Sequence, residues 1–197
     1  MAPVKPFLSD RATRRWQVML WLGLYAITAA ALAGGLVGSS VPGGNFGMMV
    51  PAGLACAFIG VGWLIALVIV VEGQHGRLSG RGAVRWLAIP LAGVLSLALV
   101  VTNAPLRARF ELSHAALDRA AARLESGRPL DSSSIGQFSV VNAWVNSPGE
   151  SIFQISDGDP LFGACGLAHT GSSYQGADPN LGTRLADDWY VWCEYMD

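Results

Sequence analysis

The chain has 197 residues, of which 52% are hydrophobic and only 14% are charged, and its mean hydropathy is +0.40. Soluble domains carry about 25% charged residues. The deficit is concentrated, because no Asp, Glu, Lys or Arg occurs from Trp16 to Val71 or from Trp86 to Leu106. A helix needs about 20 apolar residues to cross a bilayer. The composition therefore predicts an integral membrane protein and excludes a cytosolic enzyme or a nucleic-acid-binding protein.

The formal net charge of −1 conceals two halves of opposite sign. Residues 1–103 contain seven basic and two acidic residues, whereas residues 104–197 contain six basic and twelve acidic residues. An acidic second half disfavours binding to nucleic acid or to anionic lipid in that part of the chain.

The first uncharged run is too long for one helix, since its 56 residues would extend about 84 Å at 1.5 Å per residue. Its centre, 39–47, is rich in Gly, Pro, Ser and Asn, which favour a turn. We therefore expect a cytoplasmic arm at 1–15 and a three-helix transmembrane domain at 16–104, with spans at about 17–38, 48–71 and 86–103.

The basic residues predict the orientation of the spans. Four lie in the N-terminal arm and three in the 72–85 loop, but none lies in the 39–47 loop. The positive-inside rule then places the N-terminus in the cytoplasm and residues 105–197 outside the cell membrane. A cleavable signal peptide ending near Ala31-Leu32-Ala33 is an alternative for the first span, and it would export the same domain.

The spans themselves carry little chemistry. Proton relays and ion paths generally require ionisable groups within the membrane, and no such group lies inside any predicted span. A transporter or channel is therefore not expected, unless the chain is a small part of a larger one. Gly34 with Gly38 and Gly53 with Ala57 have the small-x-x-x-small spacing that lets helices approach closely. Ordinary packing within the bundle is the plainer interpretation of both pairs. Cys56, in the middle of the second span, is expected to be a free, apolar filler.

The exported part shows helix and strand patterns. Phe110, Leu117 and Leu124 recur every seven residues, and Ser113 and Gly127 are suitable caps, so we expect a helix at about 113–126. Runs of β-forming residues separated by turns follow it. The expected fold is three transmembrane helices followed by a small α+β domain with one helix and about four antiparallel strands, at 138–145, 151–155, 161–168 and 188–196.

Cys165 and Cys193 lie on the third and fourth of these strands. Two cysteines in a small exported domain predict a disulfide bond. Alternation along the last strand places Trp189, Val191 and Cys193 on one face, which we assign to the core together with Cys165 and Leu167 of the facing strand.

No motif for nucleophilic catalysis, zinc or phosphate binding is present, and no cofactor or metal is expected. Asp157-Gly158-Asp159 matches only a fragment of a calcium loop and is better interpreted as a turn. The 169–186 interval is predicted to be a long loop, and such loops are either functional or poorly ordered. His169, Tyr174 and Arg184 are its candidate ligand-binding residues, although a solvated loop is the plainer interpretation.

Four segments together resemble a known group of proteins: Arg109-Phe110-Glu111-Leu112-Ser113, Ile135-Gly136-Gln137-Phe138, Gly166-Leu167-Ala168 and Trp189-Tyr190-Val191-Trp192. They are similar to small exported domains in uncharacterised membrane proteins of high-GC Gram-positive bacteria. The resemblance covers about 109–197 and implies a helix followed by an antiparallel sheet at the cell envelope. It implies no catalytic residues.

These observations favour a non-enzymatic accessory or assembly subunit that contacts the lipid bilayer and other integral membrane proteins, and not nucleic acid. The alternative is an extracytoplasmic ligand-binding or sensing module that uses the 169–186 loop and is anchored by the three helices. An enzyme of unrecognised type acting on envelope material is a third hypothesis.

Overall fold

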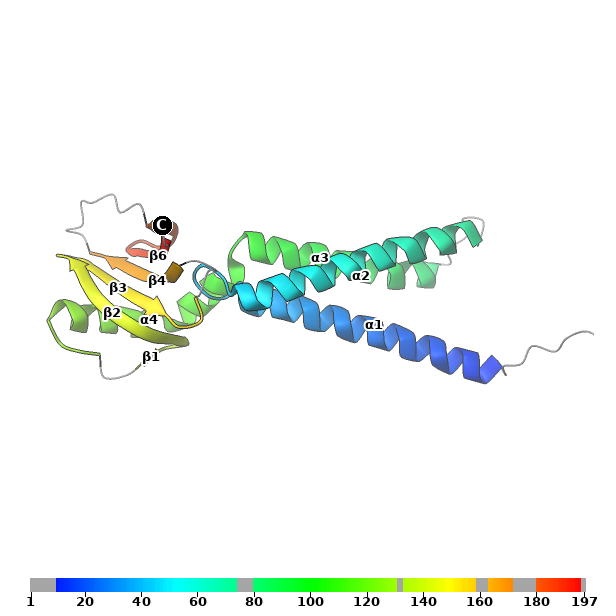
Figure 1. The fold of residues 1–197 in the computed structure, drawn as a ribbon, viewed down its shortest axis with the longest axis horizontal. Coiled ribbons are helices and arrows are strands. Elements are labelled where there is room, and N and C mark those ends of the chain that lie inside the picture. The colour runs from blue at the N-terminus through cyan, green and yellow to red at the C-terminus, as the bar shows by residue number, and fades with distance from the viewer. Residues whose placement is uncertain (1–9, 74–79, 131–132, 159–162, 172–179, 196–197) are drawn as a thin grey trace, which may run out of the picture.

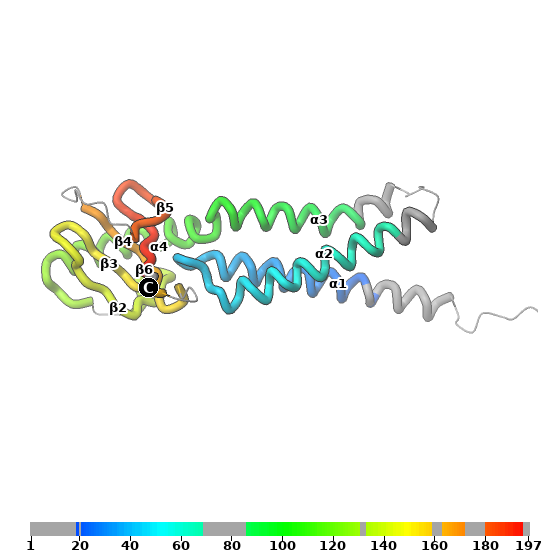
Figure 2. Tube along the Cα trace, turned by 45° about the horizontal axis from the view of Figure 1, so that its top comes forward, coloured from blue at the N-terminus to red at the C-terminus, as the bar shows by residue number. Residues whose placement is uncertain are grey.

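The structure is a computed structural model that describes residues 10–73, 80–130, 133–158, 163–171 and 180–195. Its four helices are α1 (Asp10–Gly38), α2 (Phe46–Gly73), α3 (Gly80–Val101) and α4 (Ala104–Glu125). The first three run side by side as an elongated bundle, whereas α4 lies against the sheet at one end of it (Figures 1 and 2). The molecule thus has a helical part and a separate α+β part.

Two helices are long and apolar enough to cross a membrane, through their segments Trp21–Gly38 and Phe46–Val68. The described apolar part of α3, Trp86–Val101, meets the same test only together with α4, from which it is bent by 53°. Its 16 residues extend about 24 Å at 1.5 Å per residue, somewhat less than the roughly 30 Å of a hydrocarbon core. The structure therefore supports two to three spans. Two of them are long enough by themselves.

The sheet has six strands in the order β1-β2-β3-β4-β6-β5, and all its pairs are antiparallel. The strands are β1 (Ser134–Ile135), β2 (Phe138–Ser147), β3 (Glu150–Ile155), β4 (Gly163–Thr170), β5 (Leu181–Ala186) and β6 (Trp189–Tyr195). β2, β3, β4 and β6 correspond to the four expected strands. The first three of them form an antiparallel meander, because β2 pairs with β3 and β3 with β4.

The expectation of about four strands is corrected to six. β1 is a two-residue pair against β2, and β5 lies within the interval that we predicted to be a loop. The β5 sequence Leu-Gly-Thr-Arg-Leu-Ala has little β propensity. It becomes a strand because β6 offers it an edge, with Leu181 opposite Trp192 and Arg184 opposite Tyr190. His169 and Thr170 likewise belong to β4 and not to the loop.

One face of the sheet packs against α4 and forms the main core. Phe153 of β3 lies opposite Leu167 of β4, which lies opposite Val191 of β6. Trp189 is 1% exposed, its ring stacks near Phe110 and Phe153, and its indole Nε1 donates to Asp118 Oδ1 at 3.0 Å. This hydrogen bond gives the buried indole N–H a partner, and a buried N–H without a partner would be destabilising. The predicted core face is therefore confirmed for Trp189, Cys165 and Leu167. Val191 and Cys193 are half-buried, and Trp192 and Ala168 of the opposite face form a second buried cluster with Ile152.

Helix α4 begins nine residues earlier than the sequence predicted. It starts at Ala104, directly after the turn at Thr102–Asn103, and Pro105 occupies its first turn. Proline is tolerated there because its missing N–H would have no helical partner. Ser113 is consequently no N-cap: it is buried in mid-helix, where its Oγ accepts a hydrogen bond from the Gln137 N–H at 3.0 Å.

The C-terminus of α4 is as predicted. Gly127 has φ of +73°, its N–H donates to Leu124 O at 3.0 Å, and the Arg128 N–H donates to Arg123 O at 3.1 Å. These two backbone hydrogen bonds form the Schellman motif. Glycine at this position permits the motif because it has no Cβ to clash. The chain therefore leaves the helix at a fixed angle toward β1.

Two leucines of α4 provide a test of this core. Leu117 is fully buried, whereas Leu112 is 74% exposed. We expect Leu117→Ala to lower the free energy of unfolding of the α+β domain by about 2–5 kcal/mol, because it removes buried methyl groups and leaves a cavity. Leu112→Ala should change it by less than about 0.5 kcal/mol. Chemical unfolding of the full chain in detergent, followed by tryptophan fluorescence, measures both, and equal losses would contradict the assignment of the core.

Candidate functional site at the junction of helices and sheet

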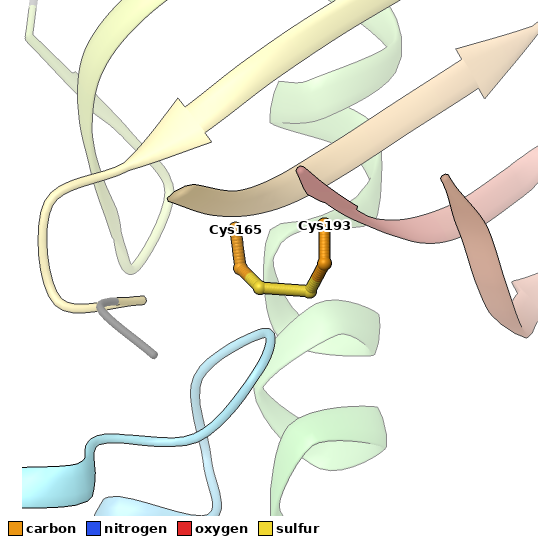
Figure 3. The surroundings of a disulfide bond; sticks show 2 residues. All are labelled: Cys165 and Cys193. Carbon is orange, nitrogen blue, oxygen red and sulfur yellow. A yellow bond between two sulfur atoms is a disulfide. The ribbon is translucent and has the colours of Figure 1, made fainter. Parts of the chain in front are cut away.

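The predicted cysteine pair lies at the end of the sheet that faces the helical bundle. Cys165 of β4 is directly opposite Cys193 of β6, and the two form a disulfide bond (Figure 3). Their N–H groups donate outward, to Gly158 O at 3.1 Å and to Asn180 O at 3.0 Å. The two cysteines thus form a non-hydrogen-bonded pair, in which facing side chains come closest. Cys56 is free, as predicted.

The α1–α2 connection packs directly on this disulfide. Figure 3 shows the connection beneath the Cys165–Cys193 bridge, with α4 nearby. A Cβ on Gly43 would overlap Cys165 Sγ, lie 2.8 Å from Cys165 Cβ and lie 3.3 Å from Cys193 Sγ. Gly43 also has φ of +74°, which L side chains rarely adopt. Only glycine fits this position, because both the space and the backbone conformation exclude a side chain.

Other residues of the connection are held by the same end of the domain. Val41 is 4% exposed and Pro42 is fully buried. The Asn45 Nδ2 donates to the Asp157 backbone O at 3.5 Å. A Cβ on Gly158 would lie 2.7 Å from Pro42 O, so the β3–β4 turn also approaches the connection closely. The segment Val41–Asn45 is therefore a docking element, whereas the sequence indicated only a turn.

Arg109 of α4 ties this contact to the rest of the domain. Its Nη1 donates to Ser40 Oγ at 3.4 Å, and its Nε donates to Gln137 O at 3.2 Å. Its guanidinium carbon lies 4.7 Å from the centre of the Phe138 ring, within cation–π distance. One planar side chain thus joins the α1–α2 connection, α4 and the start of β2.

The structure does not bring two of the candidate ligand residues, His169 and Arg184, together. His169 lies opposite Trp189, and its Nδ1 is 3.3 Å from Glu125 Oε1 of α4. Arg184 lies opposite Tyr190 and donates to Asp187 Oδ1 at 3.0 Å. Because Trp189 and Tyr190 are consecutive residues of β6, His169 and Arg184 project from opposite faces of the sheet. Tyr174 lies outside the described residues.

Asp157 and Gly158 of the Asp157–Asp159 segment are at the junction too. The Asp157 backbone carbonyl receives the Asn45 amide, and Gly158 follows in the turn, whereas Asp159 lies outside the described residues. Within the described part of the chain, no group of three or more His, Cys, Asp or Glu side chains is arranged to hold a metal ion. Asp157 and Gly158 therefore contact the α1–α2 connection and do not form a calcium loop with other described residues.

The two small-residue pairs of the spans differ in their surroundings. Gly34 faces α2: a Cβ built on it would lie 3.7 Å from the Cβ of Ala52. Gly38 faces Met48 and Met49. The first pair therefore serves packing between α1 and α2, as expected. Gly53 and Ala57 are both exposed, and nothing lies within 4 Å of a Cβ on Gly53. The second pair is consequently left open on the outside of α2.

No protein-family model matches this chain, and no curated protein or solved structure matches it.

Two adjacent glycines test the docking contact. Gly43 and Gly44 have nearly equal φ values, +74° and +76°, so alanine at either position carries a similar backbone strain of about 1–2 kcal/mol. A Cβ at Gly44 would lie 2.7 Å from the flexible Met49 Sδ and an ordinary 3.8 Å from Gly38 O, whereas one at Gly43 meets the disulfide. We expect Gly43→Ala to destabilise the protein by about 1–3 kcal/mol more than Gly44→Ala, the typical cost of overpacking.

Thermal unfolding of the full chain in detergent measures this difference. Gly44→Ala is the matched control, because it shares the backbone strain without the contact to the disulfide. Equal midpoints for the two variants would show that the connection does not rest on the disulfide.

Proposed function

We propose that this chain is a non-enzymatic integral membrane protein that serves as an accessory or assembly subunit of a larger membrane complex. Three spans would anchor it in the cell membrane, with the N-terminus in the cytoplasm and the α+β domain outside. The domain would stay in contact with the membrane helices through the docking of Val41–Asn45. The resemblance to exported domains of high-GC Gram-positive bacteria is compatible with this location and belongs to the same proposal.

The observation that carries the proposal is the open small-residue face of α2. Without a hydrophobic driving force in lipid, helices associate through close packing at small residues. The Gly34 face of α1 is already used within the chain, whereas the Gly53–Ala57 face has no partner among the described residues. The most apolar stretch of 18 residues within Phe46–Val68 of α2 contains no residue other than Ala52 that is buried against the rest of the described chain. A transmembrane helix of another protein would fit this face.

The charge pattern of the spans supports the same function. From Trp21 to Val68 the sequence contains no Asp, Glu, Lys or Arg. Ionisable groups in the membrane mark ion and proton paths. A chain without them is better suited to hold or assemble a partner than to conduct a substrate by itself.

The alternative, an extracytoplasmic ligand-binding or sensing module, predicts a different behaviour. It requires that a small molecule bind the native domain and raise its thermal stability. The separation of His169 from Arg184 gives that module no shared pocket at these two residues.

The orientation can be tested by cysteine labelling. Asn142 is an exposed residue of β2, and Ser79 belongs to the segment between α2 and α3. In a Cys56→Ala background, a membrane-impermeant maleimide on intact cells should label Asn142→Cys and spare Ser79→Cys until the membrane is permeabilised. The positive-inside rule gives this expectation. The reverse pattern would contradict the proposed orientation.

The partner can be tested by closing the open face of α2. We expect Gly53→Leu to reduce recovery of a stoichiometric membrane partner at least tenfold after mild detergent extraction, because a leucine there keeps a second helix away. The measurement is quantitative mass spectrometry of the tagged chain purified at native expression level.

Gly23→Leu is the matched control. Gly23 of α1 also has nothing within 4 Å of its Cβ position, but the residue four positions later is the large, exposed Ile27. That variant should retain the partner. If the wild-type chain purifies alone, the accessory function is refuted.

A further inference from the structure

A cavity of about 420 Å³ lies where the membrane helices meet the sheet. Its walls come from the α1–α2 connection, the first turn of α2, the α3–α4 elbow, the start of β5 and the end of β6. Ligand pockets have volumes of about 300–1,000 Å³ and occur preferentially at such boundaries between structural units. The cavity is therefore of ligand size and in a place where ligands commonly bind.

The lining combines apolar and neutral polar side chains. The apolar ones are Val41, Met49, Val100, Leu106, Leu181 and Val191. The polar ones are Ser39, Asn103, Asn180 and Thr183, and none of the described lining residues is charged. Cys193 also lines the cavity, but its sulfur is committed to the disulfide. Such a lining disfavours an anion, a cation or a metal ion and suits an uncharged molecule with both apolar and polar parts.

The position of the cavity indicates where this molecule comes from. Met49 belongs to a segment apolar enough to cross the membrane, and Val100 to the apolar end of α3. Asn180 directly precedes β5 of the α+β domain, and Thr183 belongs to that strand. With the membrane insertion and orientation proposed above, on which this inference rests, the cavity lies at the boundary between the hydrocarbon region and the α+β domain. A lipid of the outer leaflet has the boundary between its polar head and its apolar chains at this depth, so it could place both parts in the cavity.

Asn103 lines the cavity with a polar side chain that does not cap its helix. It occupies the N-cap position of α4 with φ of +52°, yet its side chain makes no capping hydrogen bond. Asparagine at an N-cap usually accepts such a bond. In the elbow the left-handed conformation, which asparagine tolerates better than most residues, allows the 53° bend between α3 and α4. The amide is therefore available to an acceptor or donor in the cavity.

We propose that the cavity binds the head of an uncharged lipid, with the Asn103 amide hydrogen-bonded to its hydroxyl or ester oxygens. The first methylene groups of its chains would lie against Met49 and Val100. A diacylglycerol has this chemistry: a neutral hydroxyl head, two esters and two acyl chains. This site is independent of the proposed partner face on α2, since Gly53 and Ala57 do not line it.

The test uses the full chain in phosphatidylcholine nanodiscs that contain a diacylglycerol with a photoreactive diazirine near its glycerol. We expect one cross-link per chain, in the peptides that contain residues 39–49, 100–106 or 180–183. Excess dioleoylglycerol should compete, whereas dioleoylphosphatidylglycerol and free glycerol should not. Competition by the anionic lipid at equal strength would refute a neutral site, and competition by glycerol would refute a lipid site.

Gly182→Leu fills the cavity. The atom nearest a Cβ at Gly182 is Val191 O at 3.5 Å, an ordinary contact, so the side chain can be accommodated. We expect at least tenfold less cross-linking, whereas Gly23→Leu, the control on α1, should equal the wild type. Unchanged cross-linking in Gly182→Leu would overturn the proposal.

Asn103→Gly is the second variant, because glycine keeps the positive φ and removes only the amide. Loss of one neutral hydrogen bond of about 1 kcal/mol should weaken competition by dioleoylglycerol about fivefold. This variant decides the question if Gly182→Leu does not fold. An unchanged affinity for dioleoylglycerol in Asn103→Gly would remove the amide from the site and overturn the proposal as stated.

Discussion

The contact between Gly43 and the Cys165–Cys193 disulfide determines how the helices and the sheet are joined. The covalent link between the two parts is short, since only Thr102 and Asn103 separate α3 from α4. A single elbow of this kind would leave the domain free to rotate about two residues. The docking of Val41–Asn45 against the disulfide and against the β3–β4 turn provides a second attachment on another side of the domain. Two attachments fix an orientation that one cannot.

Through this contact the disulfide also holds the α1–α2 connection, in addition to linking β4 and β6. Closing a loop with 28 residues of sequence separation stabilises a small domain by about 3–4 kcal/mol in the chain-entropy model. Here the sulfur atoms also form the surface on which the connection rests and, through Cys193, part of the cavity wall. The α+β domain, the bundle and the cavity therefore meet at one pair of side chains.

Long-range packing explains where the sequence-based expectations differ from the structure. The helix was expected from Ser113 because serine is a good N-cap and Pro105 follows the third apolar run. In the structure, Leu106 and Phe110 are buried against the sheet, so the helical stripe extends back to the elbow. β5 was missed because its own residues favour no strand, and it pairs with the free edge of β6. Both features depend on partners distant in the chain.

The sequence by itself determined the long apolar helices, the turn between the first two of them, the four principal strands, the C-cap at Gly127 and the cysteine pair. Each of these depends on local composition, periodicity or a residue with restricted backbone freedom, which can be recognised without knowing the partner. Only the tertiary structure decided that Gly43 packs on the disulfide, that His169 and Arg184 lie on opposite faces, and that Gly53 is open whereas Gly34 is packed. These depend on strand register and helix rotation, which are set by packing between segments far apart in the chain.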